Sequence, residues 1–271
     1  MTAVTAQPTR QVTRRVGLRE ALDSEWAKII TVRSTYWTGL ATLIIGVGLS
    51  ILLSLAITSN LSTMSAADRA KVDISFTMLA LDFAMLAIGV LGVLVISSEY
   101  SSGMIRTSLT ALPRRGLLLG AKAAVLAVVA LICGLIVAWG SYLGSSPLWS
   151  AKDITFDLGA NGNLRAVFGA ALGLMLVALF GFAIGALVRH TAGAVSIVVG
   201  IYFVAPIITS FLPNTWGKDI NKLMPSNAAH AMILTYHDPG YLTPLNGLLV
   251  LLAWIAVLLI AAFLLFKRRD A

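Results

Sequence analysis

The side chains that carry out chemistry in enzymes are sparse in this chain and follow none of the spacings that hydrolysis requires. The Gly217-Lys218 pair lacks the upstream glycine and the following Ser or Thr of a P-loop. Neither a G-x-S-x-G turn nor an H-E-x-x-H zinc motif occurs. His190, His230 and His237 are scattered and have no acidic cluster around them. The residues therefore predict no catalytic centre, no P-loop ATP hydrolysis and no metal site on this chain.

Asp82 is the one clear charge inside an apolar stretch, which runs from Asp73 to Glu99. A carboxylate is costly in lipid, so it should face the bundle interior, an aqueous cavity or a partner helix. Two interpretations stay open: a residue of a substrate path or gate, or a structural carboxylate in the outer third of its helix. The paired intramembrane carboxylates of an ion-driven carrier are missing.

Glycines recur at a spacing of four in two pairs, Gly169 with Gly173 and Gly181 with Gly185. Small residues on one helix face allow two helices to approach closely in lipid. Packing within one subunit and packing across a dimer interface both fit this pattern.

The polar stretch SSEYSSGMIRTSLTALPRR, residues 97–115, is the most informative connection. Ile105, Leu109 and Leu112 follow an i, i+4, i+7 pattern that predicts a short amphipathic helix, which Pro113 should end. Glu99 and Arg106 flank Gly103 within it. A solvated loop helix and a docking element for a partner protein both fit.

Composition places the chain in lipid. Of its 271 residues, 58% are hydrophobic and 12% are charged, and the mean hydropathy is +0.88. A soluble domain carries about twice that charged fraction, and a spanning helix needs roughly 20 apolar residues. We predict an all-α membrane protein with transmembrane helices at about 37–58, 76–97, 117–143, 165–188, 192–212 and 245–266.

Basic residues are shared unevenly between the two sets of connections that alternate along the chain. One set holds 14 of them: Arg10, Arg14, Arg15, Arg19, Lys28, Arg33, Arg106, Arg114, Arg115, Lys122, Arg189, Lys267, Arg268 and Arg269. The other holds 6, namely Arg69, Lys71, Lys152, Arg165, Lys218 and Lys222, together with 6 acids. The positive-inside rule places the first set, and both termini, in the cytoplasm. The net charge of +8 is thus a topology signal, and we expect no nucleic-acid partner.

Three regions follow from these patterns. Residues 1–17 predict a disordered basic tail. Residues 18–36 predict an amphipathic helix in the cytoplasmic interface, or a juxtamembrane segment that docks on the bundle, because apolar residues recur at helical spacing: Leu18, Leu22, Trp26, Ile29 and Ile30. Residues 37–271 predict one six-helix transmembrane domain with a tight turn at 189–191.

Two local features of that domain are also predicted. Pro206 should kink the fifth span or end its regular part. In the outer connection, 213–244, Ser226 or Asn227 can cap a short helix.

The order of these elements resembles the membrane subunit of an ABC-2-type transporter. Three passages carry the resemblance: SEWAKIITVRSTYW (24–37), EYSSGMIRTSLTALPRR (99–115) and FKRRDA (266–271). The family pattern covers the chain from about residue 18, and the middle passage is its most specific part. The resemblance implies the ABC-2-type exporter permease fold. In that fold the N-terminal helix is the elbow helix, and the loop after the second span supplies a coupling helix.

The resemblance also implies partners. It makes six residues candidates for contact with a cytoplasmic ABC ATPase: Glu99, Tyr100, Gly103, Met104, Ile105 and Arg106. It implies two permease chains, as a homodimer or heterodimer, and two separately encoded ATPases that bind ATP and Mg, with no cofactor on this chain. The implied setting is a bacterial plasma membrane and the implied role is efflux. The 213–244 connection resembles the re-entrant extracellular helices of the family.

Other function classes predict features of their own. A membrane-embedded enzyme should bring polar catalytic groups together near one interface, and the sequence has none. A stand-alone carrier or channel, or a non-transporting membrane scaffold, remains as the alternative to an exporter permease. No residue pattern selects a substrate.

Overall fold

The structure is a computed structural model that describes residues 17–69, 71–111, 114–160, 162–212, 214–236 and 239–268. Within these residues all regular secondary structure is helical. The tail predicted at 1–17 lies, apart from Gly17, outside the described residues. So do Pro113, His237 and the last three residues of the chain.

Six helical stretches of the described chain are long and apolar enough to cross a membrane. They are Arg33–Ser59, Leu81–Ser101, Arg115–Ser150, Asn163–Val188, Thr191–Ser210 and Pro244–Leu265. Each overlaps one of the predicted spans, which confirms the prediction of an all-helical chain with six candidate membrane helices. These helices suggest a multi-pass membrane protein.

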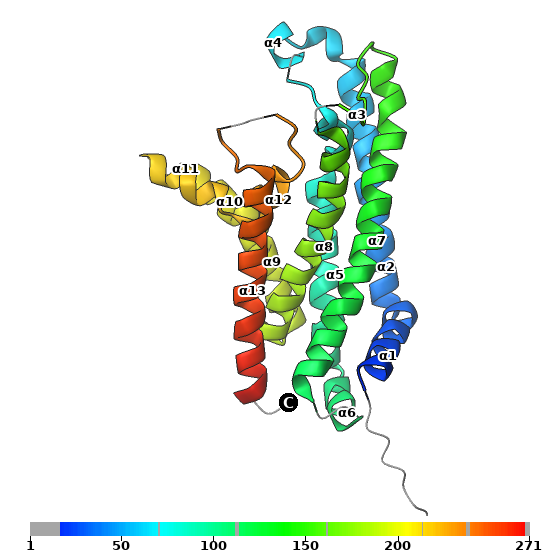
Figure 1. Ribbon diagram of the computed structural model, residues 1–271, viewed down its shortest axis with the longest axis vertical. Helices are drawn as coiled ribbons and strands as arrows, with labels where there is room; N and C mark the ends of the chain where they lie inside the picture. The colour runs from blue at the N-terminus through cyan, green and yellow to red at the C-terminus, as the bar shows by residue number, and fades with distance from the viewer. Residues whose placement is uncertain are drawn as a thin grey trace, which may run out of the picture.

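The helix α8 (Asn163–Val188) forms the centre of the bundle. In its most apolar window 72% of the residues are buried, against 17% in α13 (Pro244–Arg268). α5 (Leu81–Ser101), α7 (Arg115–Ser150) and α13 pack against α8, while α2 (Arg33–Leu43) packs on α5 and α3 (Ser50–Ser59) on α7 (Figure 1). The core is therefore the set of side chains around α8.

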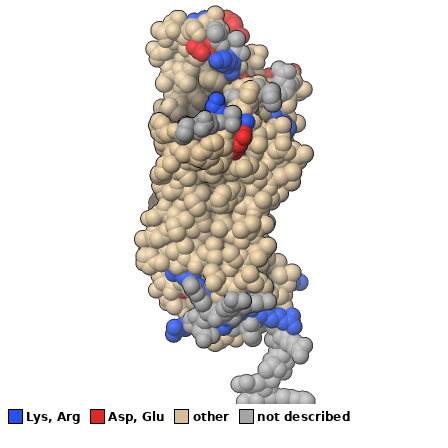
Figure 2. Space-filling model, turned by 90° about the vertical axis from the view of Figure 1, so that its left-hand side faces the viewer, with Lys and Arg blue, Asp and Glu red and all other residues tan. Residues whose placement is uncertain are grey.

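The two ends of the bundle differ. α1 (Leu18–Thr31) and α6 (Met104–Ala111) lie at one end, here called the α6 end, and α4 (Ala66–Arg69) lies at the other, the α4 end (Figure 1). Figure 2 shows a broad uncharged belt between these ends. On the face shown, Lys and Arg surround the α6 end, whereas the α4 end mixes basic and acidic groups. This distribution agrees with helices that cross a bilayer.

Glycines set the distance between α5 and α8. A Cβ built on Gly181 would lie 2.0 Å from the carbonyl oxygen of Gly89, and one on Gly185 would lie 2.7 Å from a side-chain carbon of Ile96. The two backbones can approach this closely only because no side chain stands between them.

The other two glycines of the predicted pattern face different parts of the same chain. A Cβ on Gly169 would lie 2.4 Å from the carbonyl oxygen of Met232, and one on Gly173 would lie 2.9 Å from the methyl carbon of Met85. The glycines of α8 thus make close contacts inside one subunit.

The fifth span is irregular. α9 (Thr191–Val199) passes into a π-helical turn, η4 (Gly200–Val204), and α10 (Ala205–Ser210) follows. Pro206 has no backbone N–H to bond the carbonyl four residues earlier, and the wide turn lies where that bond is lost. The prediction that Pro206 interrupts this span is confirmed. The tight turn predicted at 189–191 is also present, between Val188 and Thr191.

The second span begins later than predicted. Residues 74–78 form a short 3₁₀ helix, η3 (Ile74–Met78), and α5 begins only at Leu81. The Asp73 side chain accepts from the Ser75 amide at 3.1 Å and fixes η3, while the Ser50 hydroxyl accepts from the Ala80 amide. These bonds hold the chain in a turn where the apolar pattern predicted continuous helix.

Two further boundaries differ from the predictions. The helix predicted over 18–36 ends at Thr31, because Val32 is extended, and α2 begins a new helix at Arg33. The short outer helix α12 (Pro225–Ala231) has Met224 at its N-cap, so the capping role predicted for Ser226 or Asn227 is wrong. Proline preorganises the first helical turn, and the Asn227 amide instead donates to the Asn221 carbonyl at 2.7 Å.

Candidate functional site

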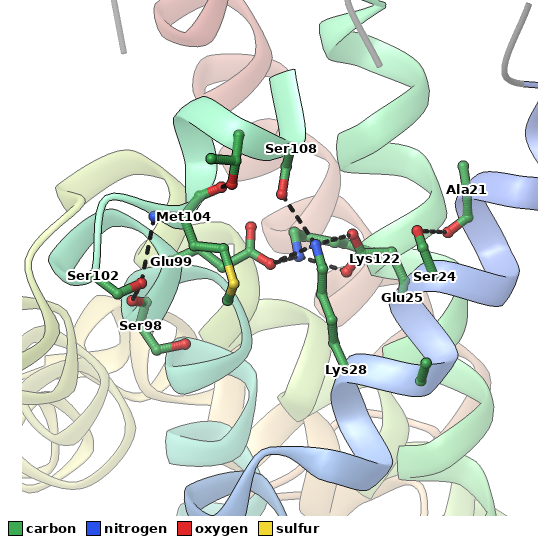
Figure 3. Close-up of polar contacts among 12 residues, drawn as sticks. Ala21, Ser24, Glu25, Lys28, Ser98, Glu99, Ser102, Met104, Ser108 and Lys122 are labelled. Atoms are coloured by element: carbon green, nitrogen blue, oxygen red, sulfur yellow. Dashed lines mark hydrogen bonds and ion pairs between the residues drawn. The ribbon is translucent and has the colours of Figure 1, made fainter. Parts of the chain in front are cut away.

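Four charged side chains from three helices meet at the α6 end. Glu25 and Lys28 come from α1, Glu99 from the end of α5, and Lys122 from the second turn of α7 (Figure 3). Glu25 and Glu99 are 2% exposed and Lys122 is 1% exposed. We call these four residues the charge cluster. Three of its members are almost fully removed from solvent.

The cluster is closely bonded. The Lys122 ammonium donates to Glu25 Oε2 and to Glu99 Oε1, both at 2.5 Å. The Lys28 ammonium donates to Glu25 Oε1 at 2.8 Å, to Glu99 Oε1 at 2.9 Å and to the hydroxyl of Ser108 in α6 at 3.1 Å. Lys28 thus uses all three of its donors, and it links α1 and α5 to α6.

Charge balance explains why such a cluster is tolerated. Two carboxylates and two ammoniums cancel, and their hydrogen bonds offset part of the cost of removing each ion from water. Burial lowers the pKa of Lys28, but hydrogen bonds and Coulombic attraction to Glu25 and Glu99 outweigh it, so the pKa lies above its usual value of 10.5. Lys28 is therefore a cation at neutral pH.

Apolar contacts seat α6 beside the charge cluster. Ile105 is 3% exposed and packs in a small buried group with Ala21 of α1 and with Leu118 and Ala121 of α7. One side of α6 is therefore tied to α1 and α7, and the other faces outward. This arrangement agrees with the amphipathic helix predicted after the second span; the side chains of Leu109 and Leu112 lie outside the described residues.

The turn between α5 and α6 needs a glycine. Gly103 has a φ of +72°, in the left-handed region that glycine occupies without strain. This conformation reverses the chain within two residues after α5 and lays α6 against α1 and α7.

A second contact at this end joins α5 to the turn between α8 and α9. The Arg189 guanidinium lies 5.2 Å from the centre of the Tyr100 ring, a cation–π distance. The Thr191 hydroxyl donates to the hydroxyl of Ser97 at 2.9 Å. The end of α5 is thus held from two sides, by the charge cluster and by Arg189.

The six residues that the resemblance singled out divide into two groups. Glu99 and Ile105 are buried and Tyr100 is half-buried, so these three face the bundle. Gly103, Met104 and Arg106 are exposed. Only the three exposed residues can touch a partner protein directly. The three that face the bundle can affect such a contact only through the packing of α6.

Asp82 does not lie deep in a span. It belongs to the first turn of α5, is half-buried, and lies near Tyr202. A carboxylate in the first turn is favoured by the helix dipole. This position favours the structural interpretation of Asp82, because the later start of α5 places it at the end of its helix.

Sequence reasoning missed the charge cluster. In the sequence, Lys28 and Lys122 contribute only to the charge asymmetry between the two sides, and Glu25 belongs to no predicted site. The sequence holds a weak indication that these charges meet. Glu25 and Lys28 are one turn apart on α1, and Glu99 and Lys122 both lie within one or two turns of the ends of apolar spans. Comparison with protein-family models and with curated proteins finds no match for this chain.

Proposed function

We propose that this chain is the membrane permease subunit of an ATP-binding cassette exporter. It forms the translocation pathway with a second permease chain, and a separately encoded cytoplasmic ATPase drives it. The α6 end faces the cytoplasm in this proposal, since it carries the excess of Lys and Arg. ATP and Mg bind to the partner chain.

The observation that supports the proposal is that α6 is bonded to the bundle on one side and exposed on the other. Met104 and Arg106 are exposed on its outward side, and Gly103 is exposed in the turn before it. Ser108 and Ile105 join it to the charge cluster and to the apolar group beneath. A force applied to α6 is therefore passed to α1, α5 and α7 together. A helix held only by the loop that carries it would lack both the hydrogen bond from Lys28 to Ser108 and the apolar contacts of Ile105 with α1 and α7.

These contacts of α6 suggest a mechanism. Closure of the ATPase around ATP would push α6, and the charge cluster would move α5 and α7 with it. Because α5 packs directly on α8, the displacement reaches the core of the bundle. ATP can drive transport only if it binds the two conformations of the assembly with different affinity.

The test is recovery of an ATPase with the purified chain. Arg106→Glu reverses an exposed charge on α6 and should reduce the amount of ATPase that co-purifies, by about tenfold if the contact is worth roughly 1.4 kcal/mol. Arg33→Glu is the matched control, since Arg33 is exposed at the α6 end but lies in α2. It should leave co-purification unchanged.

Two results would contradict the proposal. Transport by the purified chain alone in vesicles would favour a stand-alone carrier or channel. Isolation from its native membrane with no ATPase and no transport would favour a scaffold.

A further inference from the structure

A cationic cavity lies at the α4 end, away from the charge cluster. It has a volume of about 480 Å³ and is bordered by α10, α11 (Asn214–Lys222), α12 and the segment 239–241. Lys218 and Lys222 line it together with Asn221, Asn227 and Tyr241. No carboxylate is among the described residues that line it, so the cavity is suited to an anion.

Both lysines are available for a ligand, as far as the described residues go. Lys222 lies 3.7 Å from the Asp219 carboxylate, which is 70% exposed. An exposed pair at that distance is weak. Lys218 is exposed and has no carboxylate of a described residue within ion-pair distance. The two ammoniums are one helical turn apart and reach the same cavity.

The opposite face of α11 is apolar and exposed. Trp216 and Ile220 on this face, and Leu223 just after the helix, follow an i, i+4, i+7 pattern and are 51%, 36% and 45% exposed. In Figure 1, α11 extends sideways from the bundle instead of running along its long axis. Such a helix lies in the interface of a bilayer with its apolar face toward the acyl chains, and tryptophan favours that depth.

The end of α11 is fixed to the bundle. The indole N–H of Trp254 in α13 donates to the carbonyl of Leu223 at 3.0 Å. Gly217 touches the backbone of Leu212, where a Cβ would lie 2.8 Å from the carbonyl oxygen. The lysines are therefore held at one height relative to the membrane helices, and that height is the headgroup level if Trp216 sits in the interface.

We propose that Lys218 and Lys222 bind the phosphate of an anionic phospholipid from the leaflet at the α4 end. The phosphate enters the cavity, and the acyl chains pass beside α11 into the acyl-chain layer that its Trp216 face contacts. An anion that came from solution would need the lysines but would gain nothing from this apolar face. The site does not depend on the ATPase, so the inference stands apart from the proposed exporter function.

Lipid binding to the purified full chain tests the site. Native mass spectrometry of the protein in mixed micelles that contain phosphatidylglycerol measures how much lipid is retained. Lys218→Gln with Lys222→Gln should weaken retention about thirtyfold, because the loss of each lysine near a headgroup weakens binding roughly fivefold. Lys218→Arg with Lys222→Arg should retain the lipid.

The matched control removes two charges from the same end of the molecule. Lys71→Gln with Lys152→Gln changes two exposed lysines outside the cavity and should leave retention unchanged. Equal losses of lipid retention in both double variants would mean that any lysine at this end attracts the lipid, and would overturn the site. No loss in either variant would also overturn it.

A second arm separates the lipid from a soluble anion. Inorganic phosphate, titrated against bound phosphatidylglycerol, should fail to displace it at equal concentration, and Trp216→Ser should weaken lipid retention. Displacement at equal concentration, with no effect of Trp216→Ser, would assign the cavity to a soluble anion. Unchanged size-exclusion elution of each variant ensures that a loss reflects binding and not unfolding.

Discussion

Lys122 is the residue on which the balance of the charge cluster depends. Its ammonium contacts both buried carboxylates and is 1% exposed. Replacing it by an apolar residue of similar length leaves Glu25 and Glu99 with only Lys28 as a cation. A buried ion that loses its partner destabilises a protein by about 3–5 kcal/mol.

Lys122→Met should therefore lower the free energy of unfolding by about 3–5 kcal/mol, measured by denaturant titration in detergent. Adding Glu99→Gln should restore part of the loss, because the double variant again carries no net charge in the cluster. Lys152→Met, an exposed change just beyond the same helix, should lie within about 0.5 kcal/mol of the parent. Equal losses at positions 122 and 152 would mean that the ion contacts contribute nothing.

The same four residues explain why the site was only partly predictable. Composition and spacing locate apolar spans, and charges at their ends are read as solvent-exposed by default. Glu25 and Lys122 are 97 positions apart, so their pairing exists only once α1 has docked beside α7. Glu99 was selected through its loop, but its burial follows from that docking and leaves no local pattern.

Helix packing is the next scale, and glycines bring the backbones of α5 and α8 closest together. At Gly181 an added methyl would meet the Gly89 carbonyl oxygen at 2.0 Å, so the two helices would have to move apart. Overpacking of this kind costs about 1–3 kcal/mol.

Gly181→Ala should therefore destabilise the protein by about 1–3 kcal/mol and lower its midpoint of thermal unfolding. Gly120→Ala in α7 is the control, because nothing lies within 4 Å of its added Cβ. Alanine is the better helix former, so this control should be neutral or stabilising, by up to about 1 kcal/mol. A neutral Gly181→Ala would show that α5 and α8 are free to separate.

The sequence predicts that the membrane helices exist better than it predicts where they begin and end. Long apolar runs identify helices because lipid demands internally bonded backbone, and all six were found. Their ends depend on particular bonds that hydropathy does not report, such as Asp73 to Ser75 before α5 and the extended Val32 after α1. The later start of α5, at Leu81 instead of residue 76, places Asp82 in the first turn of its helix.

At the scale of the whole molecule, the orientation in the membrane decides which side of the bilayer α6 and the Lys218 cavity face. α7 is a single helix of 36 residues, and at 1.5 Å per residue it is about 54 Å long, more than the roughly 30 Å hydrocarbon core. Its two ends must therefore lie on opposite sides of a bilayer that it crosses. Arg106 is exposed just before one end and Lys152 just after the other.

Single-cysteine labelling reads this orientation directly. Cys133 is the only cysteine, so Cys133→Ser supplies a background to which Arg106→Cys or Lys152→Cys is added. On intact cells a membrane-impermeant maleimide should label position 152, and it should label position 106 only after permeabilisation, because the positive-inside rule predicts that the basic α6 end lies inside. Labelling of position 106 on intact cells would place α6 outside, out of reach of any cytoplasmic ATPase, and the Lys218 cavity would then face the inner leaflet.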